Sequence, residues 1–285
     1  MFNLFNYKNN SAMKNILVTT DFSEKSNASL RVAISLAKKH NAKVFILHVV
    51  DLPMRLATQS QIAIPEAMYF LNLSKQRFAE LMKDLDSEGV EIRDIVETNV
   101  LAASVEEAIK KHHIDLVVMG SNGASGLKEI FVGSNAEKVV RNASVPVLVI
   151  KDPEEKLEVK RIVFACDFSE KFIRPFEKAI EFSKLFDAQI DLVFVNTPYQ
   201  FLTTYEINER IAKFLAANES FKNYKVHVYN DIRIETGILN FVAENDIDLV
   251  CMFPSGRKGI AHFFNGSISG DLVNHATKPV LTIKL

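Results

Sequence analysis

The sequence predicts an α/β protein that contains two copies of one domain. Short apolar runs alternate with segments of helical periodicity along the chain, which is typical of a parallel sheet with helical crossovers. The segment Asp21–Lys25, Asp-Phe-Ser-Glu-Lys, recurs unchanged 146 residues later at Asp167–Lys171. Two further blocks recur in the same order at an offset of 133 residues, namely Ile114–Met119 at Ile247–Met252 and Pro146–Ile150 at Pro279–Ile283. Repetition in a constant order indicates a duplicated domain.

The first copy is expected to contain five strands with a helix after each of the first four. Leu30, Ile34 and Ala37 share one helical face, and Ser104 and Glu107 have the spacing of a capping box that would open a later helix. The expected strands are Ile16–Thr20, 42–50, 90–98, 115–119 and 146–150. The expected helices surround Leu30–Ala37 and span Glu66–Ser87, Ser104–His113 and Ser134–Asn142. Such an alternation implies right-handed crossovers and a parallel sheet with helices on both faces.

The second copy repeats this pattern and sets the domain boundaries. Its strands are expected near 161–165, 189–195, 224–230, 248–253 and 279–284. Residues 152–160 are charged and contain a proline, so we interpret them as a linker. The chain is therefore divided into an irregular or disordered extension (1–12), a first domain (13–151), the linker (152–160) and a second domain (161–285).

Composition excludes several classes of protein. The formal net charge of -1 lacks the basic surplus of a nucleic-acid binder. Neither an apolar run long enough to span a bilayer nor a signal peptide is recognised, so no membrane association is expected. Two cysteines cannot build a disulfide framework or a zinc site, and we interpret Cys166 and Cys251 as small buried hydrophobic residues. The protein is expected to be cytoplasmic.

A glycine-rich loop after the fourth strand is the main candidate for a ligand site. Residues Gly120–Ser134 follow the pattern G-x2-G-x9-G-S, and Asp21 ends the first strand. Ligands of open parallel sheets bind outside the carboxyl ends of the strands. Glycines let backbone amides approach a ligand, and the helix that begins after Gly133 favours phosphate through its free N–H groups and dipole. The pattern thus indicates a phosphate cradle beside a carboxylate.

With these motifs, in order and repeated, the chain from Met13 to Leu285 resembles the universal stress proteins. The resemblance implies two tandem Rossmann-like domains of the adenine nucleotide alpha-hydrolase type, each with a five-stranded parallel sheet of order 3-2-1-4-5. It further implies ATP at the loop in one subgroup, with or without Mg. The site residues carried over are Asp21 at the nucleoside, Val49 at the adenine, Met119 and Gly120 along the adenine and ribose, and Gly123, Gly133, Ser134 and Asn135 at the phosphates.

The second copy departs from this pattern. Phe253 replaces the first glycine, and Pro254 removes an N–H donor, although Gly266 and Ser267 keep the x9 spacing. Arg257 and Lys258 could still attract phosphate. We expect ATP in the first copy rather than in the second. Alternatives remain open for both copies, because Asp21 and Asp167 could only cap the following helices and the glycines could only form a tight turn.

The leading function is a non-enzymatic, nucleotide-binding protein of stress response or signalling. The alternatives are an interaction scaffold that dimerises without nucleotide, and a slow ATPase. In the family the last strands pair across a two-fold axis, so Pro146–Ile150 and Pro279–Ile283 are expected to meet antiparallel and join the copies as an internal pseudo-dimer. Homodimer formation through helical faces stays open.

Overall fold

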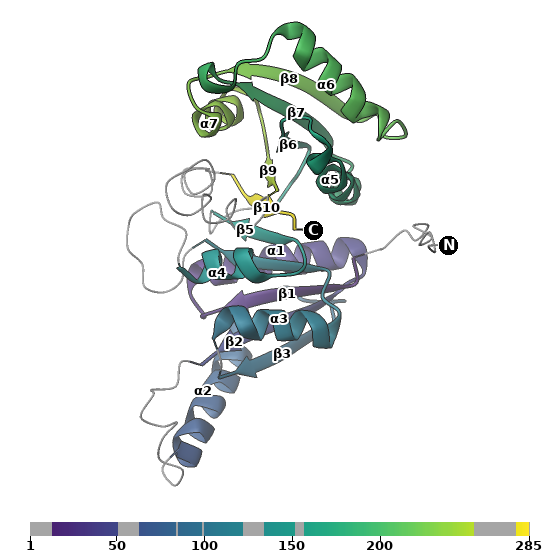
Figure 1. Ribbon diagram of the computed structural model, residues 1–285. Helices are drawn as coiled ribbons and strands as arrows, with labels where there is room; N and C mark the ends of the chain where they lie inside the picture. Colours follow the sequence, from purple (N-terminus) through teal and green to yellow (C-terminus); the bar gives the residue numbers. More distant parts are fainter. Residues whose placement is uncertain are drawn as a thin grey trace, which may run out of the picture.

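The computed structural model describes residues 13–50, 63–83, 85–98, 100–121, 134–151, 157–253 and 278–284. Ten strands of these residues form one sheet of order β3-β2-β1-β4-β5-β10-β9-β6-β7-β8 (Figure 1). The extension 1–12 and linker residues 152–156 lie outside the described residues. The end of the expected linker is part of the core, because Val159 is buried against it.

The first half follows the expected alternation of strands and helices. Its elements are β1 (Asn15–Thr20), α1 (Glu24–His40), β2 (Lys43–Val49), α2 (Ala63–Lys83), β3 (Ile92–Glu97), α3 (Leu101–His112), β4 (Leu116–Gly120), α4 (Ser134–Asn142) and β5 (Val147–Ile150). All neighbouring strands within this half are parallel. Helices α1 and α2 pack on one face of the sheet, and α3 and α4 pack on the other.

The second half repeats the order of the strands. Its elements are β6 (Arg161–Ala165), the 3-10 turn η2 (Glu170–Phe172), α5 (Ile173–Phe186), β7 (Gln189–Asn196), the 3-10 turn η3 (Pro198–Gln200), α6 (Thr204–Ala216), β8 (Tyr224–Asn230), α7 (Ile234–Glu244), β9 (Leu249–Met252) and β10 (Val280–Thr282). Counted within each half, the strand order is 3-2-1-4-5, as the resemblance implies. The α/β fold class is confirmed.

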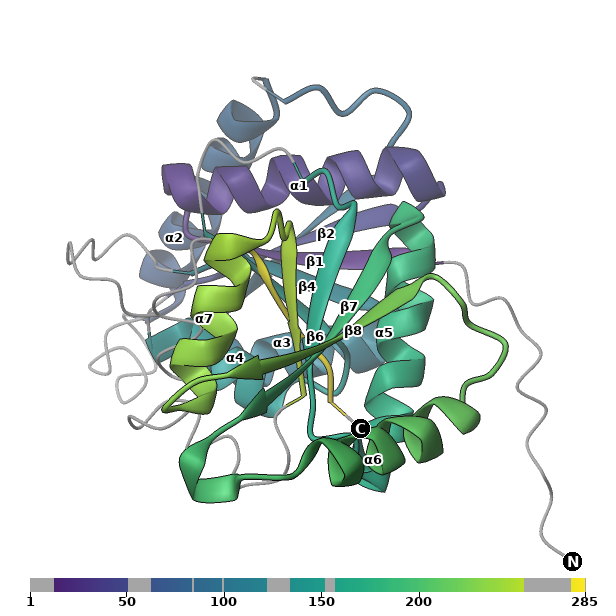
Figure 2. The same ribbon diagram turned by 90° about the horizontal axis from the view of Figure 1, so that it is seen from above.

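The two halves are joined through their last strands. Strands β5 and β10 pair antiparallel, with Leu281 opposite Leu148, and the Thr282 hydroxyl donates to the Val147 carbonyl at 3.3 Å. This confirms the expected internal pairing. Because the junction is antiparallel and each half is parallel, the carboxyl ends of the two sets of strands lie at opposite edges of the sheet. Seen from above, the strands of the two halves cross at a large angle, as the usual twist of a sheet requires (Figure 2).

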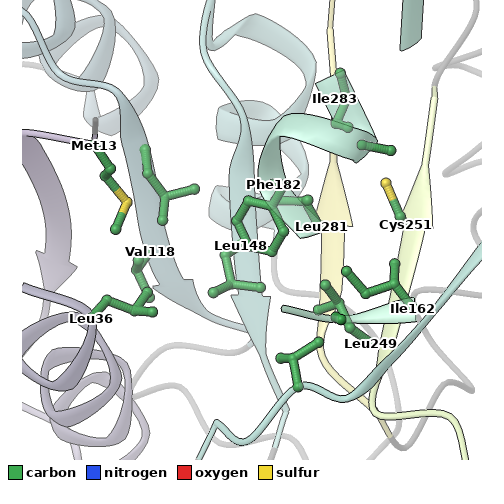
Figure 3. Close-up of a cluster of buried hydrophobic side chains, with 14 of the residues drawn as sticks. Met13, Leu36, Val118, Leu148, Ile162, Phe182, Leu249, Cys251, Leu281 and Ile283 are labelled. Carbon is green, nitrogen blue, oxygen red and sulfur yellow. The ribbon is translucent and has the colours of Figure 1, made fainter. Parts of the chain in front are cut away.

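A hydrophobic core runs across the junction. Leu148 of β5, Phe182 of α5 and Leu281 of β10 lie together at its centre (Figure 3). Helices α1 and α5 also meet, because the rings of His40 and Phe186 are 6.5 Å apart and the Lys39 ammonium lies 5.1 Å from the Phe186 ring centroid. The halves therefore share one core on this face. On the opposite face, each half has a separate core cluster.

The prediction of a capping box at Ser104 and Glu107 is wrong. Helix α3 begins three residues earlier, at Leu101, and its N-cap residue Val100 makes no side-chain capping bond. Ser104 is instead buried inside the helix, and its hydroxyl has no hydrogen-bond partner among the described residues. Packing of Val105 and its helix neighbours against the sheet outweighs the local capping preference. A reciprocal capping box occurs in α6, between Thr203 and Glu206.

Three strands of the second half are linked by a buried carboxylate. Asp191 of β7 is fully buried and accepts two hydrogen bonds from the Arg161 guanidinium, at 2.9 and 3.0 Å. Nε2 of His227 lies 2.7 Å from the same carboxylate. The hydrogen bonds from Arg161 to Asp191 raise the pKa of Arg161 above its usual value. Side chains of β6, β7 and β8 thus form one polar cluster within the sheet.

Leu281→Lys should separate the halves, because Leu281 is fully buried between Leu148 and Cys251. Loss of its packing and burial of an ammonium should lower the free energy of unfolding by about 3 kcal/mol or more. Urea denaturation measures this loss, and size-exclusion chromatography should show aggregates. The control is Val228→Lys on the outer strand β8, where an exposed side chain predicts a change within about 0.5 kcal/mol. Equal effects of the two changes would contradict the central role of this junction.

The stability of the protein should fall as the pH drops below about 6.5, the usual pKa of histidine. Burial and Lys39 lower the pKa of His40, and burial and nearby cations lower that of His112. The unfolded chain therefore binds protons that the folded protein does not, so stability is full above the unfolded pKa and is lost as the pH falls through the folded pKa. Urea midpoints at pH 7.5 and 5.5 measure the loss. It should shrink in His40→Gln and persist in the control His113→Asn at an exposed histidine.

Candidate functional site

The candidate site lies at the carboxyl edge of the first half, where β1, β2 and β4 end. These strands are parallel neighbours, so their ends meet at one edge of the sheet. The ladder between β1 and β2 stops at the pair Thr20 and His48. The next residues along the two strands are Asp21 and Val49, and Gly120 is the last residue of β4. The fold thus brings together three of the residues that the resemblance carried over.

The turn from β1 into α1 explains how Asp21 is held. Its Oδ1 accepts a hydrogen bond from the Ser23 backbone N–H at 3.0 Å, which is an Asx turn. Ser23 is the N-cap of α1, and its hydroxyl accepts from the N–H of Ser26. Helix capping therefore belongs to Ser23, while Asp21 shapes the turn before the helix. The half-buried side chain of Asp21 lies at the end of β1.

Phe22 has a left-handed backbone conformation, with φ of 62°. This region is unfavourable for a bulky residue by about 1–2 kcal/mol, so it needs support from packing. The Phe22 ring lies 4.5 Å from the ring of His48 and 5.1 Å from that of Phe78. Its N–H also donates to Thr20 Oγ1 at 3.0 Å. Packing and a hydrogen bond therefore hold the backbone next to Asp21 in a defined shape.

The second half has the same turn. Phe168 has φ of 56°, and its ring lies 5.4 Å from that of Phe214. The repeated Asp-Phe-Ser-Glu-Lys segment thus encodes a specific backbone conformation as well as marking the duplication. Sequence reasoning used the segment as a repeat and as the source of Asp21, and it missed the supporting role of His48, whose Nδ1 lies 2.9 Å from the Thr20 carbonyl oxygen. An unchanged phenylalanine in both copies was the available signal.

The other expected site residues have different positions. The Met119 side chain is 3% exposed and belongs to the core, so only its backbone lies along the strand end. Helix α4 begins at Ser134, and Asn135 is exposed in its first turn. Gly123 and Gly133 lie outside the described residues, as does the Ser134 side chain. The described part of the site is therefore the nucleoside side of the predicted arrangement and the start of α4.

In the second half, Asp167 is held by neighbouring side chains. Its carboxylate accepts from Lys171 at 2.6 Å and from the Ser169 hydroxyl and N–H. Burial alone would raise the pKa of Asp167, but these bonds outweigh burial and hold the pKa below its usual value. The Phe253 ring stands at the end of β9 and lies 6.0 Å from the Phe172 ring. Residues from Pro254 through Ser267 lie outside the described residues.

No metal site is found within the described ranges, because they contain no group of three or more His, Cys, Asp or Glu side chains that could hold an ion. Cys166 and Cys251 are free and buried, as expected. Burial raises the pKa of the Cys166 thiol to about 12 and also raises that of Cys251, so neither is a reactive thiolate at neutral pH. Among the described helices, none is both long and apolar enough to cross a membrane.

Comparison with known families identifies two matching regions. The model of the universal stress protein family matches residues 13–151 and residues 158–284, which together make up most of the chain. Both halves of the sheet thus match the same family.

Individual relatives agree with this match. A universal stress protein of Methanocaldococcus jannaschii is 33% identical over 144 residues, which is 50% of this chain and 85% of that protein. One from Synechocystis is 23% identical over 297 residues and aligns with 95% of this chain and 100% of its own length. The crystal structure of a universal stress protein from Archaeoglobus fulgidus has a TM-score of 0.70 at 22% identity, covering 95% of this chain and 96% of that one. That likeness shows a shared fold along nearly the whole chain.

Proposed function

The chain belongs to the universal stress protein family, and we propose that it binds ATP in its first domain and acts in the cytoplasm in a stress response or in signalling. The observation that carries this proposal is the convergence of Asp21, Val49 and Gly120 at one edge of the first half. The Asp21 carboxylate is suited to the hydroxyls of a ribose, and the backbone of Val49 at the end of its strand is suited to an adenine. Gly120 has no Cβ, so a ligand can approach its backbone closely.

The start of α4 supports the phosphate part of the proposal. Helix α4 follows β4 after the glycine-rich segment and begins at Ser134. Free N–H groups and the dipole at a helix N-terminus favour an anion. We assign Asp21, Val49 and the backbone of Met119 and Gly120 to the nucleoside, and Gly123, Gly133, Ser134 and Asn135 to the phosphates. Bound ATP would be the signal that the protein senses, and a Mg ion would accompany the phosphates of the bound ATP.

The second domain is not assigned a nucleotide. The ring of Phe253 stands at the end of β9, at the position that corresponds to Gly120 in the first domain. A ligand at this edge would have to displace the ring or avoid it. Because the carboxyl ends of the two halves lie at opposite edges of the sheet, the domains cannot combine their strand ends into one site.

We propose a binding role rather than catalysis. Phosphoryl transfer to water needs groups that position the water and stabilise the developing charge. At the described strand ends of the first half, Asp21 is the carboxylate beside the proposed nucleoside. We assign it to binding the ribose rather than to positioning a water molecule. A single-turnover assay with labelled ATP tests this role. Hydrolysis that is fast compared with nucleotide release would favour an ATPase instead.

Asp21→Asn should weaken ATP binding about tenfold or more, because a neutral amide replaces the carboxylate that would accept the ribose hydroxyls. Isothermal titration calorimetry measures the change in Kd. Asp167→Asn is the matched control, since it makes the same substitution at the corresponding turn of the second half. Its ATP affinity should stay that of the unaltered protein. A similar loss in both variants would assign the effect to the turn or to stability rather than to a nucleotide contact.

Gly123→Val or Gly133→Val should abolish ATP binding, because a branched side chain would enter the predicted amide cradle. The corresponding changes in the second copy, Gly256→Val and Gly266→Val, should leave the affinity within about twofold. Calorimetric titration of the four variants compares the copies directly. Equal losses from the two pairs would contradict the asymmetry, and unaltered binding in the first pair would place the phosphates elsewhere.

A further inference from the structure

A chain of hydrogen bonds runs through the turn between β1 and α1, around Asp21. The N–H of Phe22 donates to Thr20 Oγ1 at 3.0 Å, and Thr20 Oγ1 lies 3.1 Å from Ser26 Oγ. Ser26 Oγ donates in turn to the Ser23 carbonyl oxygen at 2.8 Å. Thr20 and Ser26 are both 6% exposed, so little water competes for their hydroxyls. The chain therefore ties the residues on both sides of Asp21 to the first turn of α1.

The direction of this chain follows from the number of protons that its groups carry. A hydroxyl has one proton to donate. Ser26 gives its proton to the Ser23 carbonyl oxygen, which can only accept, so Thr20 must donate its own proton to Ser26 Oγ. Thr20 Oγ1 then accepts from the Phe22 N–H. Each link thus has one arrangement of protons, and loss of either hydroxyl breaks the chain.

His48 holds the same turn from the neighbouring strand. It lies beside Thr20 in the ladder between β1 and β2, and its Nδ1 is 2.9 Å from the Thr20 carbonyl oxygen. We assign a proton to Nδ1, because a carbonyl oxygen can only accept. Thr20 is therefore held at its hydroxyl by α1 and at its carbonyl by β2, one residue before Asp21.

Asp21 is connected to this chain through Ser23. The Ser23 N–H donates to Asp21 Oδ1 at 3.0 Å, and the Ser23 carbonyl is the acceptor at the end of the chain. Both backbone groups of Ser23 are thus engaged, one by the carboxylate and the other by the hydroxyl of Ser26. A change in the chain that moves Ser23 would also move the carboxylate.

The second half keeps the turn without the complete chain. Asp167 accepts from the Ser169 N–H, and Phe168 has φ of 56°. At the offset of 146 residues, the counterparts of Thr20, Ser26 and His48 are Cys166, Phe172 and Phe194. Neither phenylalanine can make the side-chain hydrogen bonds of the residue whose position it occupies. The turn therefore forms without the chain, and a requirement of the fold does not explain why the first half has it.

One of these replacements contacts the residue at the strand end. The Phe172 ring, at the position of Ser26, lies 6.0 Å from the ring of Phe253, at the position of Gly120. Two aromatic rings thus meet where the first half has a small hydroxyl residue and a residue without a side chain. The hydrogen-bond chain accompanies Gly120 in the first half, and both are absent from the second.

We propose that Thr20, Ser26 and His48 are positioning residues of the first domain, which hold the Asp21 carboxylate in the orientation that binds the nucleoside. This inference rests on the proposed ATP site. The three residues act through the backbone on either side of Asp21, without touching the nucleotide. A carboxylate that is fixed before the ligand arrives avoids the entropy cost of ordering it on binding.

The first test compares Thr20→Val, which removes the hydroxyl, with Thr20→Ser, which retains it. Calorimetric titration of the full chain should show that Thr20→Val weakens ATP binding at least about fivefold and that Thr20→Ser stays within about twofold. His48→Phe, which introduces the residue of the second half, should also weaken binding at least about fivefold. Cys166→Val is the matched control and should leave the affinity unaltered. Normal ATP affinity in Thr20→Val or in His48→Phe would overturn the proposal.

A double-mutant cycle separates positioning from a general loss of structure. In an Asp21→Asn background the carboxylate that the chain orients is absent, so Thr20→Val should change the Kd for ATP by less than about twofold. A purely structural role of Thr20 would weaken binding by the same factor in both backgrounds. That result would overturn the positioning role.

Amide hydrogen exchange tests the link to Asp21 without a ligand. The Ser23 N–H donates to Asp21 rather than to Thr20, so its exchange rate reports how firmly the carboxylate is held. NMR of the nucleotide-free chain should show exchange at least about fivefold faster in Thr20→Val and within about twofold of the unaltered protein in Thr20→Ser. An unaltered rate in the valine variant would show that the chain does not hold Asp21.

The outcomes distinguish this inference from the proposed function. If the unaltered protein binds no ATP, the proposed function is refuted and the positioning role falls with it. If the unaltered protein binds ATP and Thr20→Val binds it equally well, the proposed function stands and the positioning role alone is refuted.

Discussion

The antiparallel pairing of β5 with β10 is the interaction on which the rest of the structure depends. Each half alone would end in an open, apolar strand edge, which is a site for aggregation. Pairing Leu148 with Leu281 closes both edges and continues the core from one half into the other. It also directs the strand ends of the two halves to opposite edges of the sheet. The same contact therefore stabilises the chain and keeps its two candidate edges apart.

Within this shared frame, the halves have kept one feature and changed others. Both retain the left-handed phenylalanine after the first strand, together with its packing against the second helix. The surroundings differ in polarity. At the offset of 146 residues, Asn27 of α1 corresponds to Ile173 of α5, and a cluster of phenylalanine rings lies in the core beside α5.

The order of the elements and the location of the candidate edge could be predicted, because they depend on periodicity and on the parallel crossover rule. The capping box at Ser104 could not, because its local spacing was correct while the packing of α3 placed that residue inside the helix. The Met119 side chain illustrates the same limit. A residue at the end of a strand can face the ligand edge or the core, and sequence position alone does not distinguish the two.

The strand order and the antiparallel meeting of the last strands were expected from the family resemblance, whereas the sequence by itself determined the α/β class and the duplication. These follow from patterns that repeat along the chain. Only the tertiary structure decided that Asp21 forms a turn stabilised by Phe22 and His48, that Asp191 is buried beside Arg161 and His227, and that the hydroxyls of Thr20 and Ser26 are linked beside that turn. Each of these features joins side chains from different elements, and the distances between such side chains are set by packing rather than by spacing in the sequence.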